Sequence, residues 1–134
     1  MKNLTLIIIL LVSFFQCTSQ KQSEYFDTRY KIVKAKILKI EEKNSIYVYH
    51  FKSGKMIGIF AKEKSCLRDT KSWKNIILNH NYNLILHQPI NANLRSAGII
   101  ETLNGEFVWD SDMREIYYDD CKNICGNKIY ELRL

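Results

Sequence analysis

The feature that most constrains the fold is strand periodicity in the first half of the chain. In residues 29–42, apolar side chains alternate with lysines as far as Ile37, so that they share one face of a strand. The phase then slips by one residue, because Leu38 and Ile40 continue the apolar series. A one-residue slip moves side chains to the opposite face, so we expect a β-bulge or sharp coil near Ile37. The alternative is a strand that passes between two sheets and is buried on opposite sides in its two halves.

The next two segments also favour β-strands, and a short loop joins them. Residues 46–51 (IYVYHF) are rich in β-branched and aromatic side chains, and residues 56–61 (MIGIFA) are almost wholly apolar. The loop at 52–55 contains Gly54, which can adopt the positive φ that a hairpin turn needs. Gly58, inside the second of these strands, predicts a bend or the close approach of another group. These segments together predict a three-stranded antiparallel meander.

The second half of the chain is less regular. Residues 62–78 mix polar and apolar side chains in a pattern that indicates a helix broken near Thr70. Residues 81–90 alternate again and predict a strand that Pro89 closes. The remaining strand candidates are 98–100 and 107–109, which a turn at Asn104-Gly105 would join, followed by 114–119 and 128–134.

This order of elements, three strands, a helix-like segment and further strands, resembles that of the OB-fold, a small and partly open Greek-key barrel. A long first strand that changes phase also suits such a barrel, because that strand takes part in both halves of the sheet. The resemblance covers roughly residues 29–90 and depends on element order. It implies a mainly β protein with one short helix, folded as an OB-like, partly open antiparallel β-barrel. A β-sandwich or an α+β domain is the alternative.

The N-terminus has the layout of an export signal. Lys2 precedes an apolar run at 4–15 that is shorter than the roughly 20 apolar residues a bilayer-spanning helix requires. Cys17 follows this run, where a lipoprotein signal peptidase would cut and where the new N-terminal cysteine would be diacylated. The segment therefore resembles a bacterial lipoprotein signal. It departs from the usual pattern because Phe15 and Gln16 replace the small residues that precede the cysteine.

The resemblance divides the chain into a signal peptide at 1–16, a flexible tether at 17–28 and a single OB-like domain at 29–134. Lipidation of Cys17 would make the protein an exported, membrane-anchored lipoprotein of the cell envelope. Cleavage after Ser19 is the alternative, because residues 17–19 also match the small-x-small pattern of an ordinary signal. That cleavage would release a soluble periplasmic or secreted protein.

The net charge of the chain indicates which classes of partner to expect. The chain has 20 Lys and Arg against 14 Asp and Glu, a net charge of +6. Removal of residues 1–16 takes away only Lys2 and leaves +5. A basic protein of the cytosol would suggest nucleic acid, but no nucleic acid is expected for an exported chain. The expected partners are a membrane, reached through the lipid anchor, and a polysaccharide or a protein; a solvated basic face is the alternative.

Three cysteines remain once Cys17 is lipidated or removed, and an oxidising compartment favours one disulfide among them. Cys121 and Cys125 are four residues apart, an offset that permits a bridge in a loop or helical turn. In an extended strand the same offset is too long for a bridge. A bond from Cys66 to either of them is the alternative. In each case one of the three thiols stays free.

One row of side chains suggests a ligand surface. Tyr47, Tyr49 and Phe51 share a face of the strand predicted at 46–51, and Lys52 and Lys55 flank the hairpin that follows. OB barrels bind oligonucleotides and oligosaccharides on the face of strands two and three, with aromatic and basic side chains. These five residues are therefore a candidate ligand-contact face. The alternative is that the aromatic row packs the barrel core.

The sequence contains no recognisable catalytic motif or phosphate loop, and its three histidines, His50, His80 and His87, form no triad or metal-ligand pattern. We therefore predict no catalytic residue, no metal and no cofactor. The chain is expected to be a cell-envelope lipoprotein that acts as a non-catalytic binding or interaction module. A secreted inhibitor or immunity-type protein is the alternative. A redox protein that uses Cys121 and Cys125 is a third, although their spacing exceeds Cys-x-x-Cys.

Overall fold

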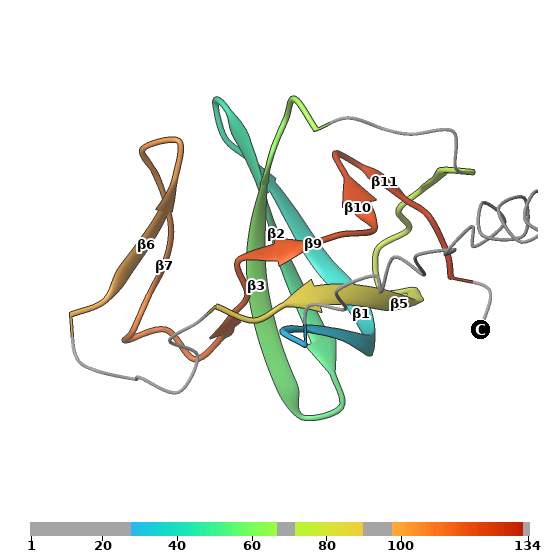
Figure 1. Cartoon of the computed structure of the whole chain (residues 1–134), viewed down its shortest axis with the longest axis horizontal. Helices are drawn as coiled ribbons and strands as arrows, with labels where there is room; N and C mark the ends of the chain where they lie inside the picture. The colour runs from blue at the N-terminus through green and yellow to red at the C-terminus, as the bar shows by residue number, and fades with distance from the viewer. Residues whose placement is uncertain (1–27, 67–71, 90–97, 133–134) are drawn as a thin grey trace, which may run out of the picture.

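The computed structural model describes residues 28–66, 72–89 and 98–132, and within these residues it contains strands and no helix (Figure 1). The strands, in chain order, are β1 (Tyr30–Glu42), β2 (Ile46–Ser53), β3 (Met56–Glu63), β4 (Lys74–Asn75), β5 (Asn81–His87), β6 (Ile100–Leu103), β7 (Glu106–Asp110), β8 (Ile116–Tyr117), β9 (Asp120–Cys121), β10 (Ile124–Cys125) and β11 (Lys128–Ile129).

A curled six-stranded sheet, in the order β8-β3-β2-β1-β5-β9, forms the centre of the molecule. β1, β2 and β3 are successive antiparallel neighbours, which confirms the predicted meander. The outer strands, β8 and β9, are separated in the chain only by Tyr118 and Asp119, and yet they pair with opposite edges of the sheet. β8 runs parallel to β3, and β9 runs antiparallel to β5.

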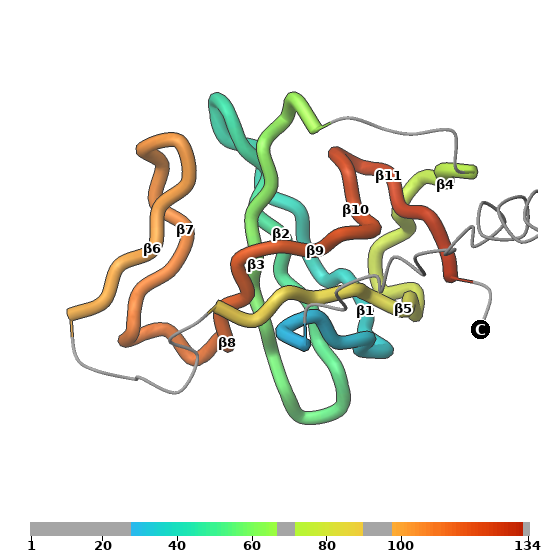
Figure 2. Tube along the Cα trace, in the orientation of Figure 1, coloured from blue at the N-terminus to red at the C-terminus, as the bar shows by residue number. Residues whose placement is uncertain are grey.

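Because one short segment of chain, 116–121, reaches both edges, the sheet curls toward closure (Figure 2). The Lys62 ammonium on β3 also donates a 2.9 Å hydrogen bond to the carbonyl of Cys121 on β9, across the gap between the two edges. The sheet is therefore a half-barrel consistent with an open OB-like β-barrel. This confirms the predicted fold class, apart from its helix.

The helix predicted at 62–78 is wrong for the described part of that segment. Lys62 and Glu63 belong to β3, and β4 pairs with β11 near the C-terminus; residues 67–71 lie outside the described residues. The extended course follows from partners that are distant in sequence. The Ile76 N–H donates to the carbonyl of Asn127 at 2.8 Å, and the ring of Trp73 packs edge-on against Tyr130.

The phase slip of the first strand is a β-bulge, as predicted. β1 pairs with β5 over residues 30–36 and with β2 over residues 36–42, and its register with β2 shifts between Ile37 and Lys39. β1 thus also takes part in both halves of the sheet. The extra residue, Leu38, is 38% exposed, so the expectation that Leu38 continues the buried face is wrong. The bulge turns this side chain outward and brings the next apolar residue back to the inner face.

The inner face of the half-barrel holds the main hydrophobic core. Its buried members come from seven strands and from the loop residue Tyr118: Ala35, Ile37, Tyr49, Phe51, Phe60, Tyr82, Leu84, Leu86, Tyr118, Cys121, Ile124 and Ile129. Gly58 on β3 is required by this packing, because a Cβ atom at its position would overlap the ring of Phe51. The close approach predicted for Gly58 is confirmed.

A second hydrophobic cluster lies on the outer face of β2 and β3. There a separate hairpin, β6–β7, packs against the sheet and stands beside the barrel (Figure 1). Its turn has positive φ at both Asn104 (52°) and Gly105 (77°), as a tight two-residue hairpin turn requires. The hairpin predicted from this dipeptide is confirmed.

Candidate functional site

The aromatic row of β2 does not form an open surface. Tyr49 and Phe51 are fully buried, and Tyr47 is half-buried and packs against the same core. The ring of Tyr49 stacks on Phe60 with centroids 4.7 Å apart, and its hydroxyl donates to the carbonyl of Gly126 at 2.6 Å. Burial raises the pKa of the Tyr49 phenol. The structure places these two rings in the core, where no ligand can stack on them.

The two lysines of the candidate face are exposed, and the structure adds two more lysines beside them. Lys36 on β1 lies directly opposite Lys52 on β2, so that their side chains leave the same outer face of the sheet. Lys34 precedes Lys36 by two residues and shares its face, and Lys55 lies in the adjoining β2–β3 turn. We call these four exposed side chains the basic face.

The surroundings of the basic face contain little negative charge. Lys36 and Lys34 lie opposite Asn81 and Asn83 of β5, and Lys52 lies opposite Ile57 of β3. None of the four lysines forms an ion pair with a described residue. Other lysines do pair: examples are Lys39 with Glu41, Lys62 with Asp120, Lys64 with Glu42 and Lys74 with Glu131.

The side chain of Ile32 adds an apolar element to this surface. It is 52% exposed and lies in line with Lys34 and Lys36 on the outer face of β1. Sequence reasoning identified Lys52 and Lys55 but missed Lys34, Lys36 and Ile32. The alternation of lysines with apolar residues in β1 contained the signal for an exposed row of lysines on one face of this strand. Only the β1–β2 register shows that this row lies next to Lys52.

The outer face of β2 and β3, where OB barrels take ligands, is filled by the chain itself. Ile46 and Val48 of β2 and Ile59 and Ala61 of β3 are buried beneath Val108 of the β6–β7 hairpin. Leu103, Trp109, Met113 and Tyr117 pack around this cluster. In this conformation, the face on which OB barrels bind their ligands is therefore a hydrophobic interface inside the protein.

Hydrogen bonds hold the hairpin in this position. The Glu106 carboxylate at the start of β7 accepts the N–H groups of Asn44 and Ser45, each at 3.0 Å, and the Ser45 hydroxyl at 2.7 Å. The Ser45 hydroxyl, followed by the Ser45 N–H, lowers the pKa of this carboxyl below its usual value. The β1–β2 turn is thereby tied to the hairpin.

A second polar cluster lies where β1, β2 and the segment before β8 meet. The ring of His50 contacts Glu41 at 3.0 Å (Nε2 to Oε2) and Glu115 at 3.7 Å (Nδ1 to Oε1). The hydrogen bond from Lys39, and then that from His50, lower the pKa of the Glu41 carboxyl to about 2. His87 lies on β5 and pairs separately with Asp119. Among the described residues, no group of three or more His, Cys, Asp or Glu side chains is arranged to hold a metal ion.

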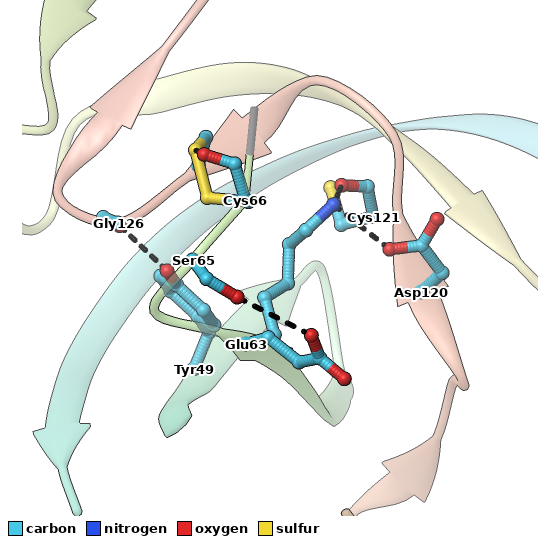
Figure 3. The surroundings of a disulfide bond; sticks show 9 residues. Tyr49, Glu63, Ser65, Cys66, Asp120, Cys121 and Gly126 are labelled. Atoms are coloured by element: carbon cyan, nitrogen blue, oxygen red, sulfur yellow. Dashed lines mark hydrogen bonds and ion pairs between the residues drawn. A yellow bond between two sulfur atoms is a disulfide. The ribbon is translucent and has the colours of Figure 1, made fainter. Parts of the chain in front are cut away.

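The disulfide joins Cys66 to Cys125, which are 59 positions apart in sequence and have Cα atoms 5.7 Å apart (Figure 3). Of the pairings that the sequence left open, the structure therefore contains one through Cys66, and Cys121 and Cys125 are not joined to each other. Cys121 lies in β9 and contributes its side chain to the barrel core. The turn at 122–123 then carries the chain to β10, where Cys125 meets Cys66.

Cys121 is the one free thiol of the described residues, and it is fully buried. Burial raises the pKa of this thiol to about 12, far from the reactive thiolate that redox cysteines require. The neighbouring Lys62 ammonium is held by Asp120 and by the Cys121 carbonyl, each at 2.9 Å. The structure thus lacks a Cys121–Cys125 dithiol, and the redox alternative gains no support from it.

The predicted lipidation site, Cys17, lies outside the described residues, as do the predicted signal peptide and all but the last residue of the predicted tether. Within the described ranges, no helix has the length and apolar character needed to cross a bilayer.

Comparison with known proteins yields no relative: no protein-family model matches the chain, and neither the curated proteins nor the solved structures contain a significant match.

Proposed function

We propose that this protein is an exported cell-envelope lipoprotein whose OB-like domain is a non-catalytic binding module. In this proposal the lipid is attached to Cys17, and the domain works through its outer surface. The observation that carries the proposal is the basic face, an exposed sheet surface whose four lysines have no ion-pair partner among the described residues. The barrel interior and the outer face of β2 and β3 are filled by the chain's own side chains.

The disulfide supports the proposed location. A bond between Cys66 and Cys125 is compatible with an extracytoplasmic compartment, because cytosolic proteins keep their thiols reduced. The N-terminal sequence, with Lys2, an apolar run and Cys17, supports export independently.

The intact mass of the mature protein tests the anchor. The full chain is expressed in a bacterial host, and the protein recovered from the membrane fraction is analysed. We expect a chain that begins at Cys17 and carries the mass of a diacylglycerol group. A Cys17→Ala variant should lack this mass and leave the membrane fraction. A wild-type chain that begins at Gln20 without a lipid would contradict the proposal and indicate a soluble secreted protein.

A secreted inhibitor or immunity-type protein is the second candidate. The observation that favours it is the exposure of two large apolar side chains on the β6–β7 hairpin, Ile100 (63%) and Phe107 (43%). Exposed apolar side chains on a rigid hairpin suit insertion into a partner protein. This candidate predicts that an Ile100→Ser/Phe107→Ser variant loses capture of a protein partner that the wild type retains, while both fold equally well.

A further inference from the structure

We propose that the basic face, together with Ile32, docks the domain on an anionic lipid surface and sets its orientation on the membrane. The ligand chemistry is the phosphate of lipid headgroups. This inference rests on the proposed envelope location. It names the partner of the exposed sheet surface, which a lipid anchor on Cys17 does not by itself identify.

The first argument is electrostatic. Lys36 and Lys52 lie directly opposite each other on antiparallel strands, an arrangement that destabilises a sheet because like charges face each other at short range. On the neighbouring strands, Lys36 lies opposite Asn81 of β5, and Lys52 lies opposite Ile57 of β3. Neither of these side chains carries a negative charge. An external anion would remove the repulsion that the fold leaves uncompensated. At an anionic bilayer surface, each such lysine strengthens binding by about fivefold.

The second argument is the shape of the surface. Ile32, Lys34 and Lys36 follow one another along the outer side of β1, and side chains two apart on a strand are about 7 Å from each other. Lys52 shares this face through its pairing with Lys36, and Lys55 lies in the β2–β3 turn that follows. Ile32 is 52% exposed, and it can enter the headgroup region while the lysines contact phosphates. This combination of basic and apolar side chains is typical of surfaces that lie on membranes.

The third argument is the distance to the proposed anchor. Eleven peptide links separate Cys17 from Thr28, so a lipidated N-terminus holds the start of the domain within about 40 Å of the bilayer. Ile32 lies only four residues after Thr28. Ile32 and the basic face therefore lie close to the point at which the proposed tether enters the domain. In this arrangement the lipid supplies affinity, and the lysines determine which side of the domain meets the bilayer.

Amine labelling of the mature protein on vesicles tests the docking. The processed full-length protein is reconstituted into vesicles of phosphatidylcholine alone or of phosphatidylcholine with phosphatidylglycerol, and lysine labelling is followed by mass spectrometry. We expect Lys34, Lys36, Lys52 and Lys55 to be labelled several-fold more slowly on the anionic vesicles. Lys64 and Lys74, which pair with Glu42 and Glu131, should be labelled equally on both. The protection should disappear at about 1 M salt, where charges are screened beyond about 3 Å.

Two double variants separate docking from a general effect of charge. Lys36→Gln/Lys52→Gln should abolish the protection of Lys34 and Lys55. Lys64→Gln/Lys74→Gln removes the same total charge and should leave that protection unchanged. Because Lys36→Gln/Lys52→Gln also removes a like-charge pair, its melting temperature should equal or exceed that of the wild type. Unchanged protection of Lys34 and Lys55 in the Lys36→Gln/Lys52→Gln variant would overturn the proposal.

The possible failures are distinguishable. Equal labelling of all lysines on both kinds of vesicle overturns the docking, even when the intact mass confirms a lipid on Cys17. An intact mass without a lipid contradicts the anchor, whereas selective protection by anionic vesicles would still support docking by the soluble protein. Protection of the same lysines by an acidic polysaccharide, but not by anionic vesicles, also overturns the lipid surface as the partner.

Discussion

At the scale of single residues, Asn123 shows how a buried polar side chain connects distant parts of this chain. Its carboxamide is fully buried; its oxygen accepts the N–H of Ile85, and its nitrogen donates to the carbonyls of Asn83 and Tyr130. The Cys121 thiol donates to the same oxygen at 3.4 Å. One side chain therefore fastens the C-terminal segment to β5.

Replacement of Asn123 by Ala should lower the free energy of unfolding by about 3 kcal/mol, because backbone groups of β5 lose their partners without access to water. Urea denaturation measures this loss. Asn81→Ala is the matched control, since Asn81 is exposed on the same strand. It should change stability by no more than about 0.5 kcal/mol. Equal losses for the two variants would contradict the role assigned to Asn123.

Glu41 should contribute a pH-dependent part of the stability. The pKa of its carboxyl is lowered from 4.5 to about 2 in the folded protein, so its stabilising effect is present above pH 4.5 and is lost as the pH falls toward 2. Solvent screens this partly exposed group, so we expect a contribution of about 1 kcal/mol.

Urea denaturation at pH 7 and pH 3 tests this prediction. The wild type should lose more stability between the two values than Glu41→Gln, by somewhat more than half of that contribution, because the folded pKa of about 2 lies below pH 3. Glu131→Gln serves as a control, because its ion pair with Lys74 is open to solvent and is expected to contribute little. A Glu41→Gln variant with the pH dependence of the wild type would show that the carboxylate is not stabilised in the fold.

At the scale of elements, local pattern predicts the long strands β1, β2, β3 and β5 and the β6–β7 hairpin, whereas it misses the two-residue strands β4, β9 and β10. The alternation and slip of β1, the hairpin of β2 and β3, and the turn at Asn104-Gly105 all depend on side chains close in sequence. The segment at 62–78 was misjudged because its partners are remote. β11 and the carbonyl of Asn127 hold it extended, and no local periodicity encodes them.

Gly58 offers a test of packing between two strands. Gly58→Ala should destabilise the protein by about 2 kcal/mol, because the added methyl group meets the ring of Phe51 on β2. Phe51→Leu makes room for that methyl group. Stability measurements on the two single variants and the double variant form a thermodynamic cycle. We expect the double variant to lose clearly less stability than the sum of the two single losses. Strict additivity would contradict the close contact.

At the scale of the whole molecule, the C-terminal third completes the barrel and secures it. The segment 116–121 pairs with both edges of the sheet, and the hydroxyl of Tyr49 donates to Gly126 in the turn that follows β10. The Cys66–Cys125 bond then ties this region to the chain that leaves β3. Closure therefore depends on contacts that the C-terminal third makes with β2, β3 and β5.

The disulfide should provide a large share of the global stability. For two cysteines 59 residues apart, loop-closure entropy gives about 4 kcal/mol. Cys66→Ser and Cys125→Ser should each lose about this amount in urea denaturation. Cys121→Ser leaves the bond intact, and non-reducing peptide mapping of that variant should still recover the linked Cys66 and Cys125 peptides. A map that links Cys121 to Cys125 in the wild type would contradict the structure.

The candidate site was only partly predictable for the same reason. Lys52 and Lys55 were identified because they flank a recognisable hairpin, whereas Lys36 joins them only through the β1–β2 register. The aromatic row was equally visible in the sequence, but alternation alone does not say which face of a strand becomes the interior. In the folded protein that row faces the barrel core, and the opposite face is covered by the β6–β7 hairpin.

The sequence by itself determined the long strands, the bulge of β1, the tight turns, the basic charge and the presence of one unpaired thiol among Cys66, Cys121 and Cys125. These properties follow from side chains within a few positions of one another, or from simple counts. The tertiary structure decided which cysteines join, which face of β2 enters the barrel core and which lysines form one surface. Each of these depends on pairing between segments far apart in the chain, and that pairing is set by closure of the barrel around its core.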